Sequence, residues 1–190
     1  HRRYKNAMAP QLFLIVPADA GPAAVSAALA PALSAAAPSA LLLVRGTQAE
    51  NAYKELVKAV LPLAQPAGCA VLIEGDPGLA RTLGADGLHV HGDVEMLRHA
   101  VAALHPDLIV GAGGARSRDD AMTMGELGAD YILFGPLSGA ISDDERELAR
   151  WWAETMEIPS VLSDPEAVAG GNAEGCEFIG LALGLLEPQA

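Results

Sequence analysis

Short apolar runs recur along the chain and are separated by longer, more polar stretches. Within each run the apolar residues follow one another without alternating with polar ones. This pattern is typical of strands in a parallel sheet that is covered on both faces. The eight runs are Leu12–Val16, Ala40–Val44, Ala70–Ile73, Gly87–Val90, Leu108–Ala112, Tyr131–Gly135, Ser160–Leu162 and Phe178–Leu183.

The stretches between most of these runs have helical patterns. Asp93 and Ser117 each precede a predicted helix and are residue types that cap helix N-termini, and Asp120 follows Ser117 at capping-box spacing. Pro31 predicts a break in the alanine-rich first helix. The five predicted helices are Pro22–Ala37, Gln48–Val60, Val94–Leu104, Arg118–Leu127 and Asp143–Met156.

Strand and helix alternate throughout the chain. This order predicts a (β/α)8 barrel that occupies residues 1–190 as a single domain, and an open doubly wound sheet is the alternative. Because 190 residues is short for a barrel of this kind, we expect the third, seventh and eighth helices to be brief.

Composition narrows the classes of partner. The net charge of −12 argues against a nucleic-acid or anionic-membrane surface. No apolar run reaches the ~18 residues that span a bilayer, and the basic start lacks a signal-peptide pattern. Cys69 and Cys176 lie in apolar surroundings and are expected to be buried free thiols, which fits a reducing compartment. We therefore expect a cytoplasmic protein.

The end of the fourth apolar run carries His89, His91 and Asp93. Alternate residues of an extended strand share a face, so the three could bind one metal ion. Asp93 also precedes a predicted helix, and as its N-cap it would turn away from the strand. In that case we expect His89 to lie deep in the barrel and only His91 to reach the mouth, where barrel active sites lie.

Two segments, GADGLHVHGD (Gly84–Asp93) and GADYILFGP (Gly128–Pro136), resemble strand-four and strand-six signatures of the thiamine phosphate synthase and thiazole tautomerase family. The resemblance extends from about Leu12 to Leu186. It implies an eight-stranded barrel that binds a small phosphorylated or heterocyclic molecule. For the synthases it also implies a magnesium-assisted joining of hydroxymethylpyrimidine pyrophosphate to thiazole phosphate, with release of pyrophosphate.

The resemblance also locates candidate site residues at the strand ends, although it assigns no catalytic residue. Magnesium would bind at Asp76 and Asp93. The substrate would bind at Arg45, Glu74, His91, Gly113, Ser138 and Ser163.

Several of these positions depart from the family pattern. The strand-five serine and histidine are Gly113 and Ala115, and the lysine after strand six is Asp143. The two strand-seven glycines are Ser163 and Asp164. A departing pyrophosphate needs cations to stabilise its charge, whereas this chain gains carboxylates. We therefore predict weak or absent synthase activity.

Other interpretations of the mouth stay open. The barrel could be a non-catalytic or retuned binding protein, in which the glycine-rich turn before Ser117 and either Arg116 or Arg118 hold an anion. It could also be a metal-dependent enzyme that uses His89 and His91. Arg45 could bind a phosphate or form an ion pair with Glu74 or Asp93. The Trp151–Trp152 pair indicates either core packing or a homodimer interface.

Overall fold

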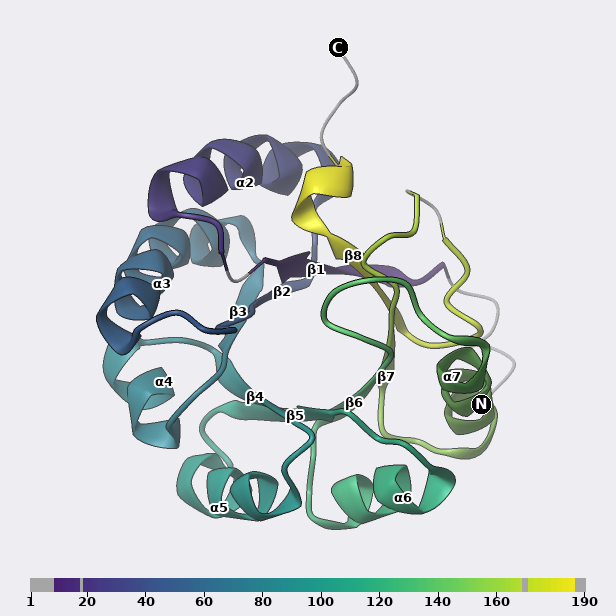
Figure 1. The fold of residues 1–190 in the computed structure, drawn as a ribbon. Helices are drawn as coiled ribbons and strands as arrows, with labels where there is room; N and C mark the ends of the chain where they lie inside the picture. The colour runs from purple at the N-terminus through teal and green to yellow at the C-terminus, as the bar shows by residue number, and fades with distance from the viewer. Residues whose placement is uncertain (1–8, 18, 169–170, 187–190) are drawn as a thin grey trace.

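The structure is a computed structural model that describes residues 9–17, 19–168 and 171–186, and these residues form a closed barrel of parallel strands (Figure 1). β1 pairs with β2 on one side and with β8 on the other, so the ring closes and the open-sheet alternative is wrong. The strands are β1 (Gln11–Val16), β2 (Ala40–Leu43), β3 (Ala70–Ile73), β4 (Gly87–His91), β5 (Ile109–Gly113), β6 (Tyr131–Phe134), β7 (Ser160–Ser163) and β8 (Phe178–Ala182). The eight-stranded barrel is thus confirmed, while a single domain over residues 1–190 stays a prediction.

All five predicted helices are present, some with shifted ends. The helix that follows the third strand, labelled α4, has only seven residues and is brief, as predicted. Within the described ranges, residues 164–177 contain no α-helix, and only a short 3-10 turn follows β8. The helices are α2 (Pro22–Ala36), α3 (Glu50–Ala64) with the 3-10 turn η1 (Gln65–Ala67), α4 (Pro77–Leu83), α5 (Val94–Leu104), α6 (Arg118–Glu126), α7 (Asp143–Thr155) and η2 (Leu183–Leu186).

The predicted break at Pro31 is wrong, because α2 continues through this residue. A proline inside a helix removes one hydrogen bond and costs about 3 kcal/mol. Pro31 is exposed, however, while Val25, Leu29 and Leu33 on the opposite face are buried. Burial of this apolar face outweighs the local cost and keeps the helix continuous.

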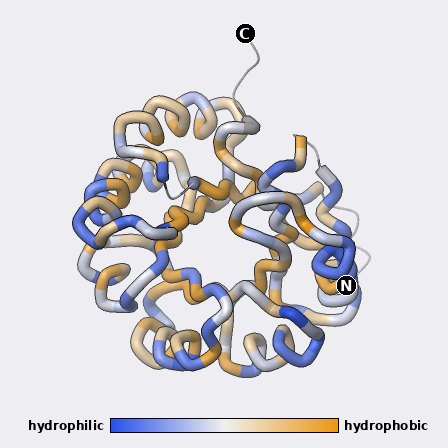
Figure 2. The backbone as a smooth tube through the Cα atoms, viewed as in Figure 1, coloured by the Kyte–Doolittle hydropathy of each residue, from blue (hydrophilic) through white to orange (hydrophobic). Residues whose placement is uncertain are grey.

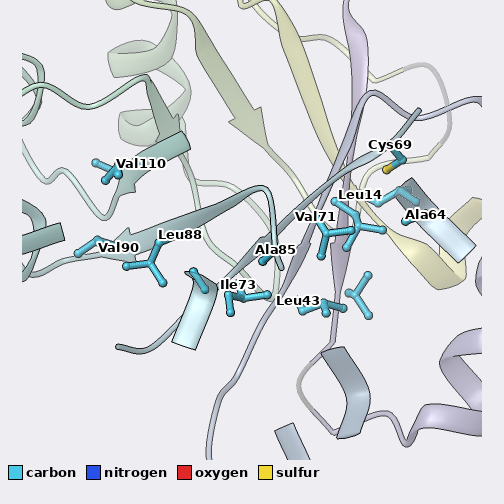
Figure 3. Close-up of a cluster of buried hydrophobic side chains, with 14 of the residues drawn as sticks. Leu14, Leu43, Ala64, Cys69, Val71, Ile73, Ala85, Leu88, Val90 and Val110 are labelled. Carbon is cyan, nitrogen blue, oxygen red and sulfur yellow. The ribbon is translucent and has the colours of Figure 1, made fainter. Parts of the chain in front are cut away.

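Two apolar layers account for the continuous apolar runs. In β1, Phe13 and Ile15 point into the barrel, while Leu14 points outward towards the helices. Figure 3 shows part of the outer layer, including Leu43 and Val71 from the next two strands. Figure 2 shows apolar residues along much of the strand ring and polar residues on outer turns of several helices, whereas the alanine-rich α2 is mostly apolar. Both strand faces are therefore buried, as the sequence predicts.

Two further expectations concern the cysteines and the membrane. Cys69 and Cys176 are buried and neither forms a disulfide, as predicted. Burial raises the pKa of the Cys69 thiol to about 12. Within residues 9–17, 19–168 and 171–186, the search for a helix both long and apolar enough to cross a bilayer found none.

Candidate functional site at the barrel mouth

Two clefts open at the C-terminal ends of the strands. The His91 cleft, of about 600 Å³, is lined by His91, Gly114, Arg116, Gly135 and Glu145, among others. The loop cleft, of about 480 Å³, is lined by groups that include Ile15, Val44, Leu137, Ser138 and Ala182. Residues 135–142, between β6 and α7, contribute to both clefts and extend over the barrel opening in Figure 1.

β4 carries a chain of hydrogen-bonded rings that leads to the His91 cleft. His89 is buried inside the barrel, where its Nδ1 lies 2.6 Å from the hydroxyl of Tyr131. Its Nε2 lies 3.1 Å from Nδ1 of His91, whose ring lines the cleft. This arrangement confirms that His89 lies deep and that, of the two histidines, only His91 reaches the mouth.

The barrel interior changes the protonation of these rings. Burial lowers the pKa of His89 well below its ordinary value, and the neighbouring His91 lowers it further. Burial also lowers the pKa of His91, although the carboxylate of Glu145 opposes this shift. Burial raises the pKa of Tyr131 well above that of a free phenol. At neutral pH the three groups are therefore uncharged.

β5 makes room for these rings with glycines. A Cβ atom on Gly113 would lie 2.6 Å from Nδ1 of His91, its cross-strand neighbour. A Cβ atom on Gly111 would lie 1.9 Å from the ring of Tyr131, which pairs with it in β6. Gly113, predicted as a substrate-binding residue, is thus the residue against which the His91 ring packs. The alternation of Gly111 and Gly113 beside two histidines was the sequence signal for this packing.

The two predicted magnesium ligands begin helices. Asp93 accepts a hydrogen bond from the N–H of Met96 at 2.9 Å and caps α5, as predicted. Asp76 accepts one from the N–H of Gly78 at 2.9 Å and caps α4. In the described part of the chain, no three His, Cys, Asp or Glu side chains are grouped closely enough to hold a metal ion. The described residues therefore do not form a metal site by themselves, and magnesium binding stays a prediction.

Arg45 and Glu74 connect the ends of β2 and β3. The carboxylate of Glu74 accepts the backbone N–H of Arg45 at 2.8 Å, and the guanidinium of Arg45 donates to the carbonyl of Gln48. The hydroxyl of Tyr53 donates to the carbonyl of Leu43 and accepts the N–H of Glu74. Burial raises the pKa of Glu74, although the backbone N–H and the charge of Arg45 oppose this shift. The contact between Arg45 and Glu74 thus runs through the backbone, and no side-chain ion pair joins them.

β7 holds the loop of residues 135–142. The hydroxyl of Ser163 donates to the carbonyl of Pro136 at 2.6 Å. Asp164 accepts the N–H of Ile141 at 3.2 Å and forms an ion pair with Arg146 of α7 at 3.2 Å. Ser163 and Asp164 thus support the loop, whose exposed Ser138 lines the loop cleft. Sequence reasoning missed Arg146, which stands inside the acidic start of α7.

The glycine-rich turn after β5 was a candidate anion site. Arg116 lines the His91 cleft, and its backbone N–H is bonded to the carboxylate of Asp120. Ser117 caps α6, while Arg118 lies over the ring of Trp151 with its guanidinium carbon 4.9 Å from the ring centre. Of the two arginines that were candidates here, Arg116 is the one that reaches the cleft.

The chain can now be compared with known proteins. The family model described as thiamine monophosphate synthase matches residues 12–174. The chain belongs to this family. Thiamine-phosphate synthase of Hyphomonas neptunium is 36% identical over 71% of this chain, and that of Rhodospirillum centenum is 33% identical over 80%. The match covers 65% of the first relative, which is less than two thirds of its length, and 75% of the second.

Solved structures agree on the fold of this thiamine monophosphate synthase family member. A thiamine phosphate pyrophosphorylase from Pyrococcus furiosus superposes with a TM-score of 0.70 and 20% identity, covering 96% of this chain and 89% of that chain. The YdjI aldolase of Escherichia coli gives a TM-score of 0.68 at 14% identity, with coverage of 95% and 77%. At these identities the likeness shows the barrel alone.

One position of β5 departs from the family pattern described above. The resemblance implies serine where this chain has Gly113. Gly113 is the direct neighbour of His91 in the β4–β5 register. The imidazole ring of His91 takes the space that a side chain at Gly113 would fill.

Proposed function

We propose that this family member binds a small heterocyclic molecule at the barrel mouth and makes thiamine phosphate weakly or not at all. One observation carries the proposal, and it is the charge of the two clefts. In the His91 cleft, Arg116 is accompanied by three carboxylates, those of Asp120, Asp144 and Glu145. The described lining of the loop cleft holds Asp19 and Glu166 but neither lysine nor arginine.

This charge opposes the chemistry of the family reaction. Departure of pyrophosphate develops negative charge, which nearby cations must stabilise. A magnesium ion would supply positive charge there, and it commonly binds through one or two carboxylates together with the substrate phosphates. Asp93 is the carboxylate at the end of β4 that could contribute, although one of its oxygens already caps α5. With so little positive charge at the mouth, phosphate-bearing substrates bind poorly.

The His91 cleft is instead suited to an uncharged ring. The neutral imidazole of His91 offers a polar contact on one wall, and Glu145 offers an acceptor at the start of α7. The alternative of a metal shared by the two histidines is less well supported. Both ring nitrogens of His89 are already engaged, by Tyr131 and by His91, and a metal would have to displace one of them.

A direct assay tests the catalytic part of this proposal. The purified protein receives both phosphorylated precursors and magnesium, and thiamine phosphate is measured over time. We expect turnover far below ~1 per second, the low end of ordinary enzymes. The Hyphomonas neptunium relative, assayed in parallel, serves as the positive control. Turnover of this protein at or above that rate would contradict the proposal.

Calorimetry tests the binding part. Thiazole phosphate, the substrate of the family reaction, and the corresponding alcohol that lacks the phosphate group are titrated separately into the protein without magnesium. We expect the alcohol to bind at least as tightly as the phosphate, because the carboxylates of the mouth repel the phosphate group. Tighter binding of the phosphate would show that the mouth attracts anions and would refute this part.

Two remaining expectations belong to the same proposal. Cys69 and Cys176 are buried and not joined in a disulfide, which supports a reducing compartment, and we infer that the protein works in the cytoplasm. Association into a homodimer stays a prediction. Trp152 is buried within its own chain, where its indole N–H donates to the carbonyl of Ile158, so Trp151 is the member of the pair available for such a contact.

A further inference from the structure

Tyr131, His89 and His91 form a chain of hydrogen bonds inside the barrel. Which group donates and which accepts in each bond can be assigned from the available donors and acceptors. The hydroxyl of Tyr131 is buried, and among the described residues it has one hydrogen-bond partner, Nδ1 of His89. A buried hydroxyl proton without an acceptor carries the full cost of its lost hydration. The phenol must therefore donate its proton to Nδ1 of His89.

The remaining protons follow from this first assignment. A neutral imidazole carries one proton, so a His89 ring that accepts at Nδ1 has its proton on Nε2. That nitrogen lies 3.1 Å from Nδ1 of His91 and donates to it. His91 must then carry its own proton on Nε2. In the described part of the chain no buried side-chain nitrogen lacks a partner, so Nε2 of His91, which has none, is open to the cleft.

We propose that Tyr131 and His89 are positioning residues that hold His91 in the tautomer with its proton on Nε2, so that the barrel mouth presents a fixed hydrogen-bond donor. If His91 instead donated from Nδ1 to His89, its Nε2 at the mouth would carry no proton and would act as a base. In the assigned direction, His91 recognises an acceptor atom of a ligand, such as a carbonyl oxygen or a ring nitrogen. The packing of the His91 ring against Gly113 and Gly114 restrains its orientation.

The surroundings of His91 agree with a neutral donor. The charged side chains that line its cleft are Arg116 from the loop after β5, Asp120 from α6, and Asp144 and Glu145 from α7. Glu145 already accepts hydrogen bonds from the backbone and the hydroxyl of Ser142, so the helix cap holds part of its carboxylate. The net charge of these four groups disfavours an anionic ligand. An uncharged ligand with an acceptor atom matches both the donor and the charge.

Nuclear magnetic resonance of protein labelled with ¹⁵N in its histidines tests the direction without any ligand. The His89 and His91 signals are assigned by their loss in His89→Gln and His91→Gln. Coupling across the hydrogen bond identifies the two nitrogens that share a proton, and the one-bond coupling shows which of them carries it. In the wild-type protein at neutral pH we expect the proton on Nε2 of His89, in about tenfold excess over Nδ1 of His91. A proton mainly on Nδ1 of His91, or equal populations, would overturn the proposal.

A pair of tyrosine variants tests the source of the bias. In Tyr131→Phe no phenol proton requires an acceptor. We therefore expect the excess of protonation at Nε2 of His89 over Nδ1 of His91 to fall at least about threefold. Tyr53→Phe is the matched control, because Tyr53 is also buried and its hydroxyl bonds to Leu43 and Glu74 outside the chain of rings. An unchanged excess in Tyr131→Phe, or an equal fall in both variants, would show that Tyr131 does not position His91. Since no ligand is needed, this failure is distinct from failure of the proposed function.

Discussion

Gly113 shows how single residues of β5 shape the mouth. Its missing side chain leaves the space in which the His91 ring lies, and a Cβ atom there would come within 2.6 Å of Nδ1. Gly111 does the same for the Tyr131 ring one layer deeper. The functional side chain on β4 and the glycine on β5 therefore form one unit, and a change in either alters both.

Gly113→Ala tests this packing. We expect a loss of about 1–3 kcal/mol in the free energy of unfolding, because the methyl group forces the His91 ring out of position. Urea denaturation followed by circular dichroism measures the loss. Gly78→Ala in α4 is the control, since its Cβ atom would meet ordinary contacts and alanine favours helices. An equal loss in both variants would contradict the assigned role of Gly113.

Caps set the positions of the helices around the mouth. Asp93 caps α5, Ser117 caps α6, and Ser142 with Glu145 forms a complete capping box at the start of α7. The predicted box at Ser117 is only partly formed, because the carboxylate of Asp120 accepts the N–H of Arg116 and not that of Ser117. These caps fix where each loop leaves its strand and thus which side chains face the two clefts.

Two substitutions of Asp93 separate a capping role from a metal role. Asp93→Ala removes the acceptor for the Met96 N–H and should cost about 1 kcal/mol in the free energy of unfolding. Asp93→Asn keeps an acceptor oxygen, and we expect stability within a few tenths of a kcal/mol of wild type. Urea denaturation in the presence of a chelator gives both values. A loss for asparagine as large as that for alanine would refute the capping role.

At the scale of the whole molecule, the barrel has one weakly covered side. Helices pack against most of the ring, whereas residues 164–177 connect β7 to β8 without an α-helix in their described part (Figure 1). Arg146 of α7 bridges this side. Its guanidinium lies 3.2 Å from Asp164, donates to the carbonyl of Asn172 and lies 3.7 Å from Glu174. One side chain thus joins α7 to the β7–β8 connection, and Asp164 in turn accepts the N–H of Ile141 in the loop over the mouth.

Arg146→Ala should therefore weaken the whole barrel. We expect a loss of about 1–3 kcal/mol in the free energy of unfolding, since the mostly buried carboxylate of Asp164 loses its hydrogen-bonded arginine partner. Arg98→Ala is the control, because Arg98 and its partner Glu95 are both exposed, and it should change stability by less than about 0.5 kcal/mol. Thermal and urea denaturation measure both variants. If Arg146→Ala proves as mild as the control, Arg146 does not bridge this side.

The sequence by itself determined the strands, most of the helices and the direction in which strand residues point. These features depend on neighbours only a few residues away, such as the continuous apolar runs or Asp93 before α5. The parity of β4 put His89 and His91 on one face, and their order along the strand, just before the cap at Asp93, was enough to place His89 deep and His91 at the mouth. Pro31 marks the limit of this reasoning, because burial of the face that carries Leu29 outweighed a local preference.

Only the tertiary structure decided which strand ends meet and what their side chains contact. Glu74 accepts the N–H of Arg45, Asp164 pairs with Arg146, and His89 lies between Tyr131 and His91. Most of these partners are more than fifteen residues apart in the chain, and no local pattern specifies their distance. The closure of the ring sets the register of neighbouring strands, and this register decides which residues face one another across the barrel. A residue such as Gly113 therefore acquired its role from His91, on the next strand, rather than from its own neighbours in sequence.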